Sequence, residues 1–166
     1  MKRSSLVLDL VWMALYASLF IVTDYLSNQI AFFKMPQGGT LGLSTVVLLL
    51  ASYQLGWKKA VGVALLTLPL QGFFAPYYSV HLLDFFLEYV VAFSVYGIAS
   101  LFPNYGKFYT GIVWVNLIRL GIHWFAGVVF WEVTVWGSLV YNAWYMIPTL
   151  LIGVILTPLI QQRLPK

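Results

Sequence analysis

Long apolar stretches separated by short polar segments occupy almost the whole chain. A helix needs about 20 mostly apolar residues to cross the hydrocarbon core of a bilayer. The stretches divide into six predicted helices, at about residues 6–28, 43–55, 60–74, 80–102, 108–130 and 135–160. We therefore expect an all-α membrane protein, with residues 1–166 forming a single integral membrane domain, a six-transmembrane-helix bundle. The second segment is short for a full span, and we expect such short segments to tilt little or to stop below the surface.

The composition agrees with a membrane protein, and the residues and motifs that are missing from the sequence reduce the number of possible functions. Of the 166 residues, 61% are hydrophobic and 8% are charged, against about 25% charged in a typical soluble domain. The chain has no cysteine, which excludes disulfides and thiolate metal sites. Its sequence also lacks a phosphate-binding loop and the H-E-x-x-H, G-x-S-x-G and paired-aspartate motifs. We therefore predict no enzyme, no metal site and no cofactor, and the chain cannot power uphill transport with ATP by itself.

Lysine and arginine fall mainly between the apolar stretches, where they orient a membrane protein. With six spans, one side of the membrane receives Lys2, Arg3, Lys58, Lys59, Lys107, Arg163 and Lys166. The other side receives Lys34 alone. Because cytoplasmic loops carry the excess of positive charge, we expect both termini in the cytoplasm of a multi-pass protein of the cell membrane. The net charge of +4 is thus explained by orientation, and we do not expect nucleic-acid binding.

Polar residues, together with one glycine, interrupt three of the predicted helices at a similar depth. They are His81, Asp84 and Glu88 in the fourth, Arg119, His123 and Gly127 in the fifth, and Tyr141, Asn142 and Tyr145 in the sixth. An ionisable side chain at bilayer depth costs roughly 2.5–3.5 kcal/mol on insertion scales, so it normally faces a protein interior or a watery cavity. Spacings of three and four residues place the polar positions of the fourth helix on one face. We therefore predict a binding cavity in the outer half of the bundle, open to the exterior.

Simpler interpretations exist for several of these residues. Asp84, and less readily Glu88, could neutralise Arg119, and we assign a structural ion pair to Asp84 and Arg119. His123 alone could be a hydrogen-bonded packing residue. Asp24, near one end of the first helix, is most simply interfacial.

A patch of small residues on the first helix consists of Ala14, Ala17 and Ser18. The spacing Ala14-xxx-Ser18 lets two helices approach closely. Such a patch serves either packing inside the bundle or contact with another subunit, and the spacing leaves both open.

Five segments carry a resemblance to a known family. They are PQGGTLGLS at 36–44, GWKKAVG at 56–62, DFFLEYVVAFSVYGIASLF at 84–102, RLGIHWFAGVVFW at 119–131 and SLVYNAWYMIP at 138–148. Their combination, over nearly the whole chain, resembles the substrate-binding S components of energy-coupling factor (ECF) vitamin transporters, of the thiamine-binding type. The resemblance implies six helices that hold thiamine near the outer surface of a bacterial cell membrane. It also implies docking on an ECF transmembrane scaffold subunit that works with two ATPase subunits.

The resemblance implies roles for particular residues as well. Glu88 and Tyr89 would address the aminopyrimidine end of thiamine. The rest of the site would be lined by His123, Gly127, Trp131, Tyr141 and Asn142, and Tyr145 lies at the same depth. The small residues of the first helix would correspond to the scaffold-docking motif, although here the register runs from an alanine to a serine.

One departure from the family concerns the first outer loop. Family members can stack the ligand on a tryptophan there, whereas residues 29–42 contain none. The role is therefore unfilled or passes to Phe32 or Phe33.

The chemistry of thiamine suits the predicted site. Thiamine is a cation with two aromatic rings, and a carboxylate, hydrogen-bonding groups and aromatic faces can bind it. We expect Glu88 to be the main charged contact, His123 and Asn142 to be polar partners, and Trp131 to be a stacking face. Two alternatives remain open: an S component for another vitamin or a thiamine precursor, such as riboflavin or the pyrimidine moiety, and a structural six-helix membrane scaffold protein whose polar cluster is internal packing.

Overall fold

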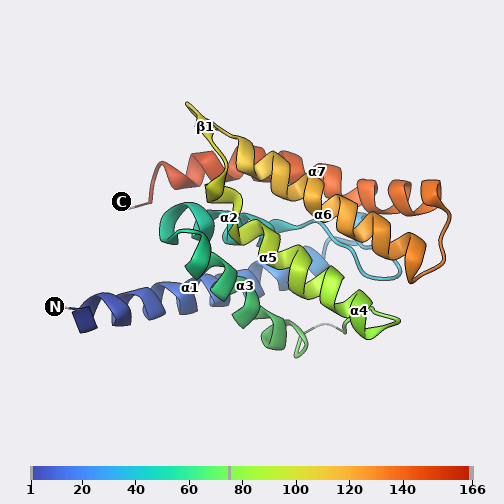
Figure 1. Ribbon diagram of the computed structural model, residues 1–166, viewed down its shortest axis with the longest axis horizontal. Coiled ribbons are helices and arrows are strands. Elements are labelled where there is room, and N and C mark those ends of the chain that lie inside the picture. Colours follow the sequence, from blue (N-terminus) through green and yellow to red (C-terminus); the bar gives the residue numbers. More distant parts are fainter. Residues whose placement is uncertain (1, 75, 165–166) are drawn as a thin grey trace.

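Each predicted segment forms a helix in the computed structural model, which describes residues 2–74 and 76–164 and the side chains of these except 2–5 and 31 (Figure 1). The helical segments are α1 (Lys2–Asn28), α2 (Leu43–Leu55), α3 (Trp57–Gln71), the continuous run of α4 (Leu82–Phe85), η2 (Phe86–Val91) and α5 (Ala92–Gly97), then α6 (Thr110–Val129) and α7 (Val135–Gln161). Short 3-10 turns, η1 (Ala31–Phe33) and η3 (Ala99–Leu101), follow α1 and α5. The bounds of α2 match the prediction. α3 starts earlier than predicted because Gly56, at a φ of 83°, turns the chain within one residue.

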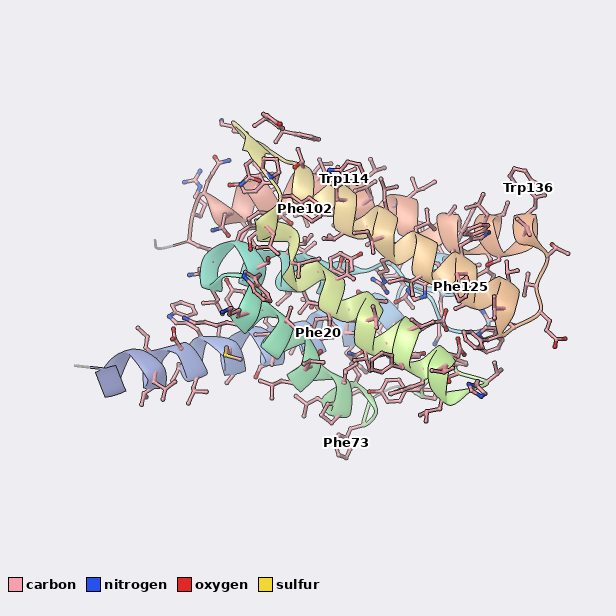
Figure 2. All side chains as sticks on the ribbon, viewed as in Figure 1. Phe20, Phe73, Phe102, Trp114, Phe125 and Trp136 are labelled. Atoms are coloured by element: carbon pink, nitrogen blue, oxygen red, sulfur yellow. The ribbon has the colours of Figure 1, made fainter. Side chains whose placement is uncertain are left out.

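Three helices of the described chain are long and apolar enough to cross a membrane. They are Leu6–Asn28 within α1, α6 and α7, with mean hydropathies of 2.1, 1.6 and 1.9. Large apolar side chains also cover the outside of the bundle, and Figure 2 shows Phe73 and Trp136 projecting from it, with exposed fractions of 81% and 74%. An apolar surface of this extent fits contact with lipid. The protein is therefore a helical membrane protein.

Helix α2 lies in the middle of the bundle. Its residues from Ser44 to Ser52 are all buried, and it packs against α1, α3, α5 and α7. The 13 residues of α2 extend about 20 Å at a rise of 1.5 Å per residue. This length is short of the roughly 30 Å hydrocarbon core of a bilayer. The neighbouring helices shield α2 from lipid, which explains why a short apolar segment suffices here.

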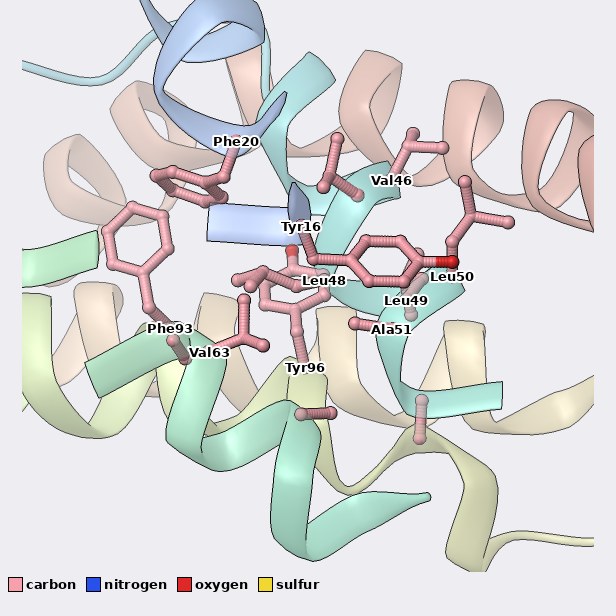
Figure 3. Close-up of a cluster of buried hydrophobic side chains, with 14 of the residues drawn as sticks. Tyr16, Phe20, Val46, Leu48, Leu49, Leu50, Ala51, Val63, Phe93 and Tyr96 are labelled. Carbon is pink, nitrogen blue, oxygen red and sulfur yellow. The ribbon is translucent and has the colours of Figure 1, made fainter. Parts of the chain in front are cut away.

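The core that surrounds α2 is shown in Figure 3. Phe20 of α1 meets Phe93 of α5 edge to face, with ring centroids 5.6 Å apart. Leu48 of α2 and Val63 of α3 are completely buried between these helices. Lipid tails are as apolar as leucine, so close packing holds such helices together in a bilayer. This core fixes α1, α3 and α5 relative to one another below the functional site.

The segment between α5 and α6 differs from the prediction. Instead of a loop followed by a helix from residue 108, β1 (Asn104–Tyr105) and β2 (Phe108–Tyr109) form an antiparallel hairpin. Gly106 takes a φ of 60°, which a tight hairpin turn requires. Residues 108 and 109 belong to the hairpin, so α6 begins later than predicted, at Thr110.

The two ends of the bundle carry different parts of the chain. The first and last described residues lie at the same end as the β-hairpin, and the connections before α4 and between α6 and α7 lie at the other end (Figure 1). Of the basic residues in the predicted charge pattern, Lys166 and the side chains of Lys2 and Arg3 lie outside the described residues.

Candidate ligand-binding site

A cavity of about 370 Å³ lies among the described helices and connecting loops, away from the hairpin end. All eight residues predicted to contact a ligand line it: Glu88, Tyr89, His123, Gly127, Trp131, Tyr141, Asn142 and Tyr145. Pockets of roughly 300–1,000 Å³ with a few convergent polar groups are typical of small-molecule sites. The structure therefore brings these residues of η2, α6, the connection after α6, and α7 together at one candidate site.

Glu88 and Tyr89 lie on a π-helical turn, η2, which interrupts an otherwise α-helical run. Such turns insert one extra residue into a helix and occur frequently at functional sites. Glu88 lines the cavity, whereas Asp84 is completely buried outside its lining. The predicted common face of His81, Asp84 and Glu88 assumed a regular α-helix. The π-turn interrupts that helix, but the side chains of Asp84 and Glu88 still interact with each other. His81 instead caps α4, where its Nδ1 atom accepts a hydrogen bond of 3.1 Å from the Leu83 N–H.

A chain of hydrogen bonds connects Arg119, His123 and Glu88. The Nε–H group of Arg119 donates to Nε2 of His123 over 3.0 Å, and Nδ1 of His123 lies 3.0 Å from Oε1 of Glu88. Arginine nitrogens can only donate, so Nε2 of His123 must be an acceptor and its proton must reside on Nδ1. His123 is thus neutral in this arrangement and donates to the Glu88 carboxylate. The charge of Glu88 is balanced through the imidazole by Arg119.

Arg119 lies beneath this chain, and its side chain is buried. The guanidinium carbon is 4.7 Å from the centre of the Phe93 ring, within the range of a cation–π contact. Its Nη1 atom is 3.4 Å from the hydroxyl of Tyr96, which donates in turn to Asn116 over 2.8 Å. The predicted pair of Arg119 with Asp84 is not formed between these two described residues. The carboxylate of Asp84 accepts the backbone N–H of Val80 at 3.0 Å and so turns toward the start of its own helix.

Side chains of α7 form another wall of the cavity. Oδ1 of Asn142 accepts a hydrogen bond of 2.7 Å from the Tyr145 hydroxyl, and Nδ2 donates to the Ser138 carbonyl over 2.9 Å. Gly127 of α6 faces this wall, and a Cβ atom at residue 127 would lie 2.2 Å from Oγ of Ser138. Gly127 therefore lets α6 and α7 approach closely beside the cavity.

Two tyrosine hydroxyls hold the loops that cover the cavity. The Tyr141 hydroxyl accepts from the Gln37 N–H at 3.0 Å and donates to the Gly38 carbonyl at 3.2 Å. The Tyr89 hydroxyl accepts from the Tyr78 N–H at 2.8 Å and donates to the carbonyl of the same residue at 3.3 Å. Both loops line the cavity, and neither was predicted to do so. Part of the first loop, in the PQGGTLGLS segment at 36–44, served only as evidence of the family resemblance and was assigned no contact with a ligand.

Helices α1 and α3 also contribute side chains to the cavity, which was not predicted from the sequence. Asp24 and Asn28 of α1 and Gln71 of α3 line the cavity. The sequence favours an interfacial position for Asp24 because the residue lies near the end of its helix. Its spacing of four residues from Asn28 was the available signal, since it places both side chains on one helix face.

Neither Phe32 nor Phe33, in the connection between α1 and α2, takes the role of a stacking tryptophan in this structure. Phe32 is 69% exposed and packs on Trp144, with ring centroids 5.6 Å apart, and neither Phe32 nor Phe33 lines the cavity. The cavity is lined instead by aromatic rings from other elements: Tyr77, Tyr78, Tyr89, Phe93, Trp131, Tyr141 and Tyr145.

The small residues of α1 divide between two faces. Ala14 and Ser18 are exposed, and Oγ of Ser18 donates to the Ala14 carbonyl over 2.9 Å. Ala17 is only 5% exposed and packs in the core beside Phe20. Ala14 and Ser18 are thus available to a partner helix, and Ala17 is not.

Comparisons with known proteins identify a family for this chain. Residues 10–166 match the family described as thiamine transporter protein (Thia_YuaJ). The chain is also similar to the thiamine transporter ThiT of Bacillus subtilis (strain 168), with 28% identity over 187 aligned positions that cover 100% of this chain and 96% of the relative.

Proposed function

The chain belongs to the thiamine transporter protein family, and from this premise we propose that it is the thiamine-binding S component of an ECF-type transporter. In this role it captures thiamine in the cavity at the outer face of a bacterial cell membrane. Membership of a transporter family supports a role in transport rather than catalysis. The proposal assigns the whole chain, residues 1–166, to one membrane domain that acts without a cofactor.

The charge and shape of the cavity carry this proposal. Two carboxylates, of Asp24 and Glu88, and one guanidinium, of Arg119, line it. With His123 neutral, these groups leave one negative charge, which suits a singly charged cation such as thiamine. The aromatic lining suits the two rings of the ligand through stacking and cation–π attraction. Riboflavin is uncharged and lacks this match.

We assign the two ends of the ligand from these contacts. The carboxylate of Glu88 and the hydroxyl of Tyr89 address the aminopyrimidine, whose amino group is a hydrogen-bond donor. His123 and Asn142 are polar partners, and Trp131 is a stacking face. Tyr141, Tyr145 and Gly127 complete the lining, with Gly127 leaving room between α6 and α7.

For topology we propose six spans with both termini in the cytoplasm. The distribution of basic residues supports this orientation. Lys58 lies in the first turn of α3, Lys107 in the β-hairpin and Arg163 just after α7, so they belong with the chain termini, while Lys34 belongs with the loops near the cavity. The cavity then faces the exterior, where the vitamin is scarce and has to be captured.

ATP-driven transport against a gradient requires partners, because the sequence has no phosphate-binding loop. We propose an ECF transmembrane scaffold subunit and two ATPase subunits in this role. The exposed pair Ala14 and Ser18 on α1 supports a docking face, since small side chains allow close helix contact in a bilayer.

A binding screen tests the proposed function. The purified protein is titrated calorimetrically with thiamine, with its pyrimidine precursor and with riboflavin. We expect saturable binding of one thiamine per chain, weaker binding of the precursor and no binding of riboflavin. Preferential binding of the precursor or riboflavin would reassign the vitamin, and a folded protein that binds none of the three would favour the structural scaffold alternative.

A further inference from the structure

One polar atom in the cavity wall has no partner among the described residues. Gln71, at the end of α3, is 7% exposed and lines the cavity, and its Nε2 atom makes no hydrogen bond within the described protein. A buried N–H group without an acceptor is unfavourable, and native structures leave few of them. An acceptor on a bound ligand would satisfy this group.

Asp24 lies on the same cavity and is also incompletely compensated. Its Oδ1 atom accepts a hydrogen bond of 2.9 Å from Oγ of Ser44. Two contacts within 4 Å join basic and acidic side chains in the described part of the chain, Lys59 with Asp9 and the neutral His123 with Glu88, and neither includes Asp24. The side-chain hydrogen bonds to both carboxylates come from neutral groups, the His123 imidazole for Glu88 and the Ser44 hydroxyl for Asp24. Arg119 interacts electrostatically with both Asp24 and Glu88, so one guanidinium faces two carboxylates and one negative charge of the cavity stays unbalanced.

Asp24 and Gln71 come from helices that pack against each other, α1 and α3. Glu88 and His123 come from η2 and α6, so the two polar pairs belong to different walls of one cavity. We propose that Asp24 and Gln71 form a second ligand-contact pair, in which Asp24 balances the positive charge of the thiazolium ring and Gln71 donates a hydrogen bond to an acceptor atom of the same ligand. This inference rests on the proposed function as a thiamine-binding protein.

A charge-selective comparison tests the role of Asp24. Thiamine and deazathiamine, an isostere without the positive charge, are titrated into the purified wild type and the Asp24→Asn variant. The change is isosteric, and the Ser44 hydroxyl can still donate to the side-chain oxygen of asparagine. We expect thiamine to bind the variant about tenfold to a hundredfold more weakly, as for loss of a charge-assisted contact, and deazathiamine to bind both proteins equally.

The matched control is Asp9→Asn, an identical change on the same helix, in a partly exposed ion pair with Lys59 outside the cavity lining. Its thiamine affinity should equal that of the wild type. An unchanged thiamine affinity in Asp24→Asn, or an equal loss for both ligands, would overturn the assignment of Asp24.

Gln71 is tested by Gln71→Leu, which removes the orphan donor at similar volume. A leucine at position 71 should raise the thermal unfolding temperature of the empty protein, because a buried unsatisfied group is lost. It should also weaken thiamine binding by about threefold to tenfold. Unchanged affinity would overturn the role of Gln71. A wild type that does not bind thiamine would overturn the proposed function itself, whereas normal wild-type binding with unaffected Asp24→Asn and Gln71→Leu variants overturns only this inference.

Discussion

Nδ1 of His123 lies 3.0 Å from Oε1 of Glu88, across the contact between α6 and the π-helical turn η2. The bond joins two helices at the cavity and holds the Glu88 carboxylate in a fixed orientation toward it. Because Arg119 donates a hydrogen bond to Nε2 of His123, it determines that the imidazole proton resides on Nδ1, the atom that faces Glu88.

Glu88→Gln should weaken thiamine binding about tenfold to a hundredfold, because a hydrogen bond to a charged group contributes roughly 1.5–3 kcal/mol. His123→Ala should weaken it less, since it removes an orienting partner and leaves the carboxylate. Glu132→Gln is the control, since Glu132 is exposed in the connection between α6 and α7 and does not line the cavity. Calorimetric titration of each folded variant with thiamine measures these affinities. An unchanged affinity in Glu88→Gln would show that Glu88 does not contact the ligand.

Gly127→Ala should separate α6 from α7, because its Cβ atom would lie 2.2 Å from Oγ of Ser138. Overpacking of this kind costs about 1–3 kcal/mol, so we expect a lower unfolding temperature together with weaker thiamine binding. Gly121→Ala is a control on the same helix, since nothing lies within 4 Å of the position of its added Cβ. Adding Ser138→Gly to Gly127→Ala should restore part of the lost stability. If Gly127→Ala behaves like Gly121→Ala, the close approach of α6 and α7 at this point is disproved.

Tyr141→Phe should loosen the first outer loop, because the hydroxyl bonds to both Gln37 and Gly38 are lost. Each ordinary hydrogen bond contributes about 0.5–1.5 kcal/mol, and the phenyl ring preserves the packing. Hydrogen exchange at residues 37–40 should accelerate, and thiamine should dissociate several-fold faster. Tyr105→Phe, on the exposed hairpin at the other end of the bundle, should change neither quantity. Equal exchange in Tyr141→Phe and wild type would show that the loop is held by other contacts.

Tryptophan substitutions on α1 separate docking from packing. Ala14→Trp should abolish thiamine uptake in cells that contain the partner subunits and leave binding by the purified protein intact, because residue 14 is exposed. Ala17→Trp should reduce expression and thermal stability, because residue 17 is buried in the core. Loss of binding and uptake together in Ala14→Trp would instead indicate that residue 14 supports the fold.

Cysteine labelling tests the proposed topology, since the native chain has no cysteine to remove. A membrane-impermeant maleimide should label Lys34→Cys in intact cells and label Lys58→Cys only after permeabilisation. Both residues are exposed at the protein surface, so accessibility within the fold is matched. The reverse labelling pattern would invert the orientation.

Hydrophobic patterning predicted the helices well because each helix of a membrane protein needs its own apolar stretch. The depth of polar residues on the predicted helices likewise brought His123, Asn142 and Glu88 to one site. What patterning could not predict depends on local departures from regular geometry. The helix that carries Glu88 contains a π-turn where regular α-helix was expected, and the positive φ of Gly106 allows a hairpin where a loop and the start of a helix were expected. The position of Asp24 in the cavity depends on how α1 is rotated against its neighbours, and a single helix does not encode that rotation.

The enclosed position of α2 has a consequence for how the protein is made. A helix that enters the membrane independently must exchange water for lipid along its whole length, and then associates with the others in a second stage. At about 20 Å, α2 is too short to bridge the hydrocarbon core alone. It is joined to α3 through the single turn residue Gly56. We expect α2 and α3 to enter the bilayer together as a helical hairpin against α1. Insertion of this protein into the membrane therefore depends on helix packing from the first helices onward. A substitution that disturbs the packing of α2 against its neighbours should lower the amount of inserted protein more than it lowers the ligand affinity of the protein that does insert.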